Sequence, residues 1–285
     1  MWKKMLTISL ALVMVLSFTA CASEVTEEVG LPSTQEIVDG VLESLDNIKT
    51  FQFDMDMTVD MSGEVEGEAV EMTMVMDSDA AIDVENREMG MKINIDMALP
   101  DEGEMEIGEE VYIIGNMMYM FIDVPGTGPM WLKSKMPAGS WGHMSQNEAQ
   151  IELLKTAQVK VMGSEKIQGI DCYVFELTPD MEQLWQIAMQ QATVVGEEVL
   201  PDVPEEFFQE MFRSFSVKQW IAKDTYYLTK VETDMAIELT AEAMGIEEGE
   251  VFQDITMTLF IYDYNEPVSI VLPPEAKGAI EIPIE

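Results

Sequence analysis

The sequence has few cysteines, histidines and basic residues. Two cysteines and one histidine in 285 residues exclude most metal sites built from thiolates or imidazoles. Only 15 Lys and Arg residues stand against 54 Asp and Glu residues, which gives a formal net charge of -39 at pH 7. Nucleic-acid-binding proteins need a basic surface that displaces phosphate counterions, so we expect no nucleic acid as a partner. Hydrophobic residues make up 47% of the chain, which is enough for a large core and too many for a disordered acidic tail.

The motifs of common enzyme classes are also missing. The sequence contains no Walker loop, no dinucleotide glycine fingerprint and no His-Glu-x-x-His zinc motif. A Ser-His-Asp or Cys-His arrangement would have to use His143, a single histidine in a loop rich in glycine and tryptophan. Paired carboxylates for glycoside hydrolysis carry little information in a chain with 54 acidic residues. We therefore expect no enzyme, no cofactor and no metal.

The N-terminus has the features of a lipoprotein signal. Lys3 and Lys4 precede an apolar stretch over 5–16, which is shorter than the roughly 20 residues that a membrane-spanning helix needs. The following residues, Phe18-Thr19-Ala20-Cys21, resemble the lipobox of bacterial-type lipoproteins. This pattern predicts a signal peptide over 1–20 and a lipid on Cys21 that anchors the protein to the outer face of the cell membrane. The alternative is an ordinary secretory peptide with an incidental cysteine.

Residues 21–33 are predicted to form an acidic tether, followed by a single domain over 34–285. Cleavage before Cys21 would remove two lysines, so 13 basic residues would face 54 acidic ones and the net charge would be -41. The eleven residues 22–32 reach at most roughly 36 Å when extended at about 3.3 Å each. That exceeds the Debye length of about 8 Å in physiological salt, so the tether can hold an anionic domain clear of an anionic membrane. The second cysteine, Cys172, is expected to be a small buried hydrophobe.

Most of the domain has the pattern of antiparallel strands. Ser33 and Glu36 form a capping box before an amphipathic helix expected over 34–49. From 51 onward apolar and polar residues alternate, which is typical of strands with one buried and one solvated face. The alternating apolar positions are Phe51, Phe53, Met55, Met57, Val59 and Met61, then Met72, Met74 and Met76, then Met89, Met91, Ile93, Ile95 and Met97. A hairpin is expected over 112–119 around Gly115-Asn116, with later strands at 158–166, 170–178, 215–222, 226–239 and 251–263.

The total is about eleven strands, more than an open sheet usually holds without curling into a barrel or splitting. Two further helices are expected after Ser145 and after Thr178.

The 26 methionines allow three interpretations. Thioethers favour Cu(I), but the Met-x-Met spacings are those of period-two strands and no Met-His cluster accompanies them. A packed core is the second interpretation. The third is a cavity, because methionine is flexible and polarisable and suits surfaces that adapt to varied apolar ligands. On the opposite strand face, Asp54, Asp56 and Asp60 could hold calcium weakly. We favour a solvated sheet face, because no EF-hand-type loop accompanies them.

Three stretches resemble the LolA/LolB-like lipoprotein-carrier superfamily, and within it the LppX/LprG-type lipid-binding lipoproteins. The stretches are Tyr112–Tyr119 with Trp131-Leu132-Lys133, Trp220–Thr225 with Leu228–Glu232, and Ile261–Asn265 with Pro267–Ile270 and Leu272-Pro273. The resemblance implies a mainly β (α+β) fold, in which a single large antiparallel sheet of about eleven strands curls into an unclosed half-barrel. Helices would cover its concave face, and acyl chains would lie between them and the sheet.

The resemblance implies a membrane-anchored extracytoplasmic carrier or chaperone that binds a lipid or acyl chain. Other partners would be the membrane, through the lipid on Cys21, and an envelope protein. The competing hypothesis is a lipid-anchored surface interaction or sensing module with a filled core and no ligand. The residues expected to line the cavity are Met55, Met57, Met74, Met91, Ile93, Met118, Met120, Trp185, Phe207 and Phe208.

Overall fold

The computed structural model describes residues 31–99, 103–123, 126, 128–136, 141, 158–178, 181–182, 210–241 and 248–282. The regular elements are an α-helix, a short 3-10 helix and twelve strands. The helices are α2 (Thr34–Leu45) and η1 (Pro274–Gly278). The strands are β1 (Thr50–Val65), β2 (Glu68–Asp83), β3 (Glu88–Leu99), β4 (Gly103–Ile114), β5 (Met117–Asp123), β6 (Met130–Lys135), β7 (Gln158–Ile167), β8 (Ile170–Thr178), β9 (Phe212–Ala222), β10 (Leu228–Thr240), β11 (Gly249–Tyr262) and β12 (Ile280–Glu281).

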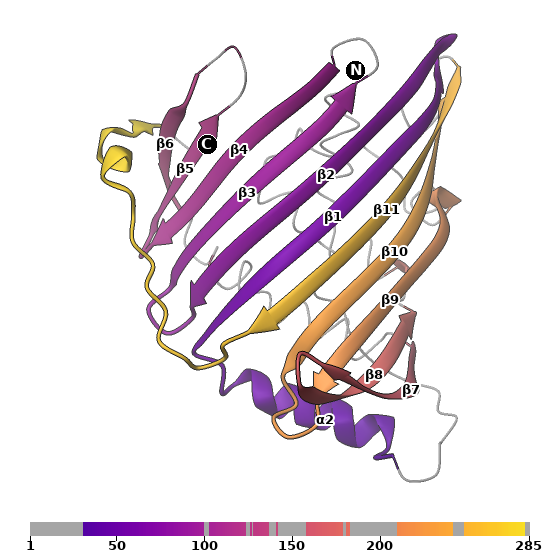
Figure 1. Ribbon diagram of the computed structural model, residues 1–285, viewed down its shortest axis with the longest axis vertical. Helices are drawn as coiled ribbons and strands as arrows, with labels where there is room; N and C mark the ends of the chain where they lie inside the picture. Colours follow the sequence, from indigo (N-terminus) through magenta and orange to yellow (C-terminus); the bar gives the residue numbers. More distant parts are fainter. Residues whose placement is uncertain are drawn as a thin grey trace.

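All twelve strands belong to one sheet, in the order β12-β6-β5-β4-β3-β2-β1-β11-β10-β9-β8-β7 (Figure 1). Neighbouring strands are antiparallel, except that β12 pairs with β6 in parallel. The two outer strands, β12 and β7, do not pair with each other among the described residues, so the sheet stays open. The predicted fold class, a mainly β protein with one large unclosed antiparallel sheet, is confirmed, with twelve strands where about eleven were expected.

The two faces of the sheet differ in chemistry, as the alternation predicted. Along β1, Met57, Val59 and Met61 are buried, while Asp54 and Asp60 are exposed. We call the face that carries the buried residues the inner face and the opposite one the outer face. From β6 through β1 to β10 the registers run without a shift, so inner residues of neighbouring strands lie side by side there.

Helix α2 begins at the predicted capping box. The Ser33 hydroxyl accepts a hydrogen bond from the Glu36 backbone at 3.2 Å, and the Glu36 carboxylate accepts one from the Ser33 backbone at 2.8 Å. The helix ends at Leu45, earlier than the expected 49, because the chain closes with two tight turns before β1 begins at Thr50. Ile37 and other apolar residues of α2 are buried in the main core.

Three features of the sheet differ from the sequence-based expectation. The first half of β4 was not predicted, because glutamates and a glycine between 104 and 110 obscure its apolar alternation. Strand β9 begins at Phe212, three residues before the expected start. After β11, the chain crosses the ends of several strands and reaches β6 (Figure 1), where the Ile282 amide donates to the Lys133 carbonyl at 2.9 Å.

The signal peptide, most of the tether and the two later helices cannot be compared with the fold. Residues 1–30 lie outside the described residues, as does most of the expected helical sequence after Ser145 and Thr178. Only Met181 and Glu182 of that later sequence are described, in a helical conformation. None of the described helices combines the length and apolar character needed to cross a membrane.

Candidate functional site

The inner face of the sheet brings together seven of the ten predicted cavity residues. In β1, Met55 and Met57 are inner residues, and Met57 pairs with Met76 on one side and Met257 on the other. The registers of β2 to β6 place the remaining five on the same face. These are Met74, Met91, Ile93, Met118 and Met120. The other three candidates, Trp185, Phe207 and Phe208, lie outside the described residues.

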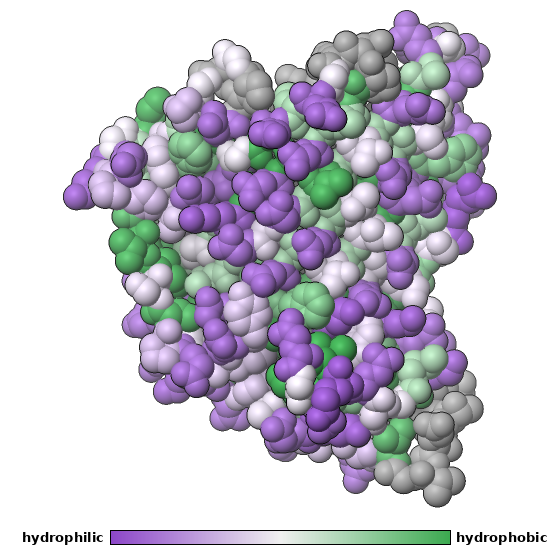
Figure 2. Space-filling view, in the orientation of Figure 1, coloured by the Kyte–Doolittle hydropathy of each residue, from purple (hydrophilic) through white to green (hydrophobic). Residues whose placement is uncertain are grey.

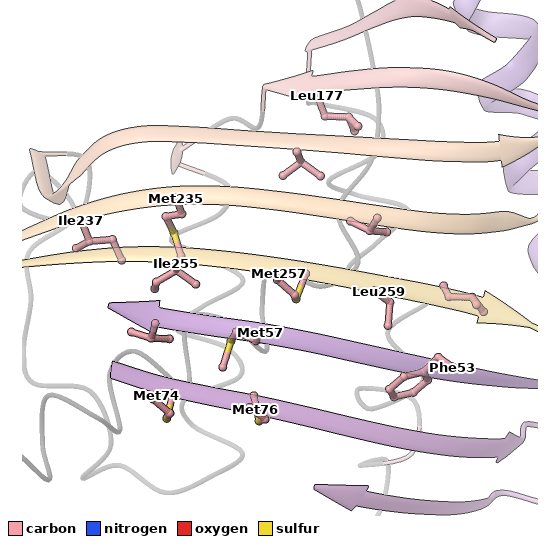
Figure 3. Close-up of a cluster of buried hydrophobic side chains, with 14 of the residues drawn as sticks. Phe53, Met57, Met74, Met76, Leu177, Met235, Ile237, Ile255, Met257 and Leu259 are labelled. Carbon is pink, nitrogen blue, oxygen red and sulfur yellow. The ribbon is translucent and has the colours of Figure 1, made fainter. Parts of the chain in front are cut away.

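Methionines meet one another across neighbouring strands of this face (Figure 3). Met74 pairs with Met97, which in turn pairs with Met105 on β4. Met61 pairs with Met72 at the far end of β1. The result is a thioether-rich area, the methionine half, that we define as the inner face of β1 to β6.

The inner face of β8 to β11, together with α2, has a different composition. Branched aliphatic and aromatic residues predominate among its buried side chains, and Met235 and Met257 are the buried methionines of these strands. The branched and aromatic residues are Phe175, Leu177, Val217, Val231, Ile237, Leu239, Val251, Ile255, Leu259 and Ile261. Helix α2 lies at this side of the sheet (Figure 1), where the Ser44 hydroxyl donates to the Tyr226 carbonyl at 3.3 Å. Side chains with few, well-defined rotamers are typical of an ordinary packed core. The composition of this half is therefore explained without a ligand.

The methionines of the inner face differ in burial. Met57 is 2% exposed and Met74 is 1% exposed, whereas Met91, Met118 and Met120 are only half-buried. Burial on these strands is uneven, because Ile113 on β4 and Ser134 on β6 are both 0% exposed. The half-buried methionines are the part of the methionine half that is nearest to solvent.

Among the residues that the structure describes, three hydroxyl groups on the inner face are buried without a hydrogen-bond partner. They belong to Ser78 on β2, Ser134 on β6 and Thr233 on β10. A buried polar group without a partner costs about 1–3 kcal/mol, so such groups are rare in native proteins and need an explanation. Sequence analysis missed all three, although Ser78 interrupts the run Met72, Met74, Met76 in the same alternation.

Glu109 of β4 also faces inward, between Ile93 on β3 and Ile122 on β5. Burial among these side chains raises the pKa of its carboxyl above the usual value. Sequence analysis missed this residue because it lies in a run of glutamates. Glu109 follows Met105 and Ile107 at intervals of two residues, and this spacing places all three side chains on the same face of β4. That spacing is the sequence signal that could have identified Glu109.

The outer face carries most of the acidic residues of the sheet. Hydrophilic residues predominate where the sheet faces the viewer (Figure 2). Tyr262 donates to Asp54 at 2.9 Å and Thr73 donates to Asp60 at 2.7 Å. Within the described part of the chain, no group of three or more His, Cys, Asp or Glu residues could hold a metal ion.

Cys172 lies on the outer face in a small separate cluster with Val174 and Trp220. The thiol is free and fully buried, and burial raises its pKa. Its burial confirms the expectation of a small buried hydrophobe. A thiol with a raised pKa is also a poor nucleophile.

Comparisons with known proteins give a family and a set of related folds. The chain matches no curated protein. Among solved structures it is similar to LprF from Mycobacterium bovis, at 13% identity and a TM-score of 0.42, over 86% of this chain and 99% of LprF. It is also similar to a candidate outer membrane lipoprotein-sorting domain from Vibrio parahaemolyticus, at 12% identity and a TM-score of 0.25, over 82% of this chain and 94% of that one. A DUF1329 family protein from Desulfovibrio piger matches at 13% identity and a TM-score of 0.24, over 82% of this chain and 94% of that chain.

Scores this low carry no argument about ligands, which must come from the residues of the inner face. The model of a family of unknown function, DUF6612, matches residues 33–281, and the chain therefore belongs to that family.

Proposed function

We propose that this protein is a membrane-anchored extracytoplasmic lipoprotein that binds an amphiphile with an acyl or alkyl chain against its inner face, as a carrier or chaperone. The observation that carries the proposal is the methionine half of the inner face. We assign the protein no catalytic role.

The contrast between the two halves of the inner face supports a ligand. Methionine has three rotatable bonds and a polarisable thioether, so a surface made of it can repack around chains of different shape. A core that only has to be filled is better specified by leucine, isoleucine and valine, which are the residues found beside α2. Stiff side chains thus predominate at one end of the sheet, where Met235 and Met257 are the exceptions, and adaptable ones predominate at the other.

The energetics suit a carrier. Burying an acyl chain contributes about 0.8 kcal/mol per methylene, so ten methylenes give roughly 8 kcal/mol before costs. Association and ordering remove several kcal/mol of this, which leaves binding in the micromolar range. Binding of that strength allows a ligand to be handed on.

A second candidate function is a surface interaction or sensing module with a filled core. The near-complete burial of Met57 and Met74 favours it, since these side chains already have neighbours on all sides. The two candidates make opposite predictions for substitutions on the half-buried part of the methionine half.

The test is Met91→Gln, with Ala98→Gln on the outer face of the same strand as its control. If Met91 contacts a ligand, the added amide reduces binding of a fluorescent lipid probe, while the melting temperature stays near that of the wild type. In a filled core the same amide would be buried without a partner and would cost about 1–3 kcal/mol of stability. A large loss of stability, with no probe binding even in the wild type, would favour the sensing module. Met57→Phe is a second probe, because overpacking a filled core also costs about 1–3 kcal/mol.

The anchor is tested separately by Cys21→Ser. We expect this variant to be released into the soluble fraction or to stay unprocessed, because the acylated thiol is lost. Normal processing with full membrane retention would contradict the lipoprotein assignment.

A further inference from the structure

The inner face carries one ionisable carboxyl away from the ends of its hairpins. Across the paired positions of the described strands, inner residues are apolar or uncharged with few exceptions. Glu68, Lys166 and Asp171 also occupy inner-face positions, but each lies at the end of a hairpin and is exposed. Glu109 is different, because it lies in the middle of β4 and is only partly exposed.

The described residues around Glu109 offer no counter-charge. Its direct neighbours across the strands are Ile93 and Ile122, and the next inner residues on its own strand are Ile107 and Val111. No hydrogen bond or ion pair of its carboxyl is found with the described residues. A carboxylate in such a place is costly to desolvate unless a ligand supplies a partner.

A second polar group lies in the same cross-strand row. The row runs from Met55 through Ser78 and Ile93 to Glu109 and Ile122. Ser78 is 5% exposed, and its hydroxyl has no hydrogen-bond partner. Two strand spacings separate it from Glu109, or about 10 Å. A polar amphiphile lying along this row would satisfy both groups at once.

We propose that Glu109 is the polar subsite of the inner face, and that the ligand is a cationic amphiphile whose amine or ammonium group pairs with this carboxylate while its chain lies on the methionine half. This inference rests on the proposed function and names the class of ligand.

Charge favours a cation over the other head groups. A neutral head group would be served by a serine or glutamine at lower desolvation cost, whereas a carboxylate gains most from a positive partner. The net charge of -39 raises the local concentration of cations and repels anionic amphiphiles. Both effects act in the same direction.

Binding should depend on pH through this one group. Burial raises the pKa of the Glu109 carboxyl, and the described residues that face it from β3 and β5 are apolar and do not titrate. As the pH falls through this raised pKa the carboxylate takes up a proton, so the preference for a cation should weaken.

The experiment compares dodecylamine, dodecanol and dodecanoate by isothermal titration calorimetry below their micelle concentrations. The protein is the whole mature chain with Cys21→Ser, so that no acyl anchor competes for the inner face. We expect dodecylamine to bind roughly tenfold more tightly than the other two, because even a partly screened ion pair has this magnitude. In Glu109→Gln the three affinities should fall within about threefold of one another. Glu109→Asp should keep the preference, and so should Glu106→Gln, which removes a charge from the outer face of the same strand.

The outcomes separate the two proposals. Equal binding of all three chains to the wild type would overturn the cationic ligand and leave the proposed function standing. An amine preference that survives in Glu109→Gln would also overturn it, because the attraction would then come from the acidic protein as a whole. Failure of every chain to bind would contradict both proposals.

Discussion

At the scale of single residues, alternation predicted which face each side chain occupies, but not how deeply it is buried. Met57 and Met91 have the same pattern in the sequence, yet one is fully buried and the other half-buried. Burial also changes along a single strand, since Met91 is half-buried while Ile93 on the same strand is buried. The period-two pattern does not contain this information. Glu109 was missed because its neighbours in the chain are acidic, although its partners across the strands are isoleucines.

Truncation should show this difference in burial. Met57→Ala is expected to lower the free energy of unfolding by about 2–5 kcal/mol, because it leaves a cavity in a closed environment. Met91→Ala should cost clearly less, since its side chain is half-buried and solvent can fill the space. Urea denaturation of both variants measures the two values. Equal costs would mean that Met91 is as tightly packed as Met57.

At the scale of elements, strands with regular alternation and the capped helix were predictable, and irregular segments were not. The hairpin around Gly115 was predicted and is confirmed, because a two-residue turn between alternating strands has a local signature. The segment after β11 has no period, so its return to pair with β6 depends on tertiary contacts alone.

The docking of α2 on the sheet depends on Gly40. A Cβ atom at this position would lie 2.6 Å from the ring of Tyr226, so the ring packs directly against the helix backbone. Gly40→Ala should therefore destabilise the protein by about 1–3 kcal/mol through overpacking, even though alanine favours a helix by about 1 kcal/mol over glycine. Glu43→Ala, at an exposed position of α2, is the control and should be close to neutral. Thermal unfolding followed by circular dichroism measures both, and a stabilised Gly40→Ala would contradict the close contact.

At the scale of the whole molecule, the acidic residues of the sheet gather on one face and methionine on the other. With a net charge of -39, self-repulsion should weaken the folded state at low ionic strength. We expect the melting temperature to rise as sodium chloride increases from low to moderate concentration. At physiological ionic strength the Debye length is about 8 Å, so repulsion between carboxylates farther apart than this is largely screened. A flat or falling trend would mean that the outer-face charges are too dispersed to matter, or already neutralised by bound cations.

The central claim, that the methionine half holds a ligand, is tested most directly by native mass spectrometry of the mature protein carrying Cys21→Ser, purified from the cells that make it. The claim predicts a second population whose added mass is that of an amphiphile, released on unfolding and reduced in Met91→Gln but not in Ala98→Gln. A single species at the mass of the polypeptide, unchanged after incubation with dodecylamine and with fluorescent lipid, would contradict it.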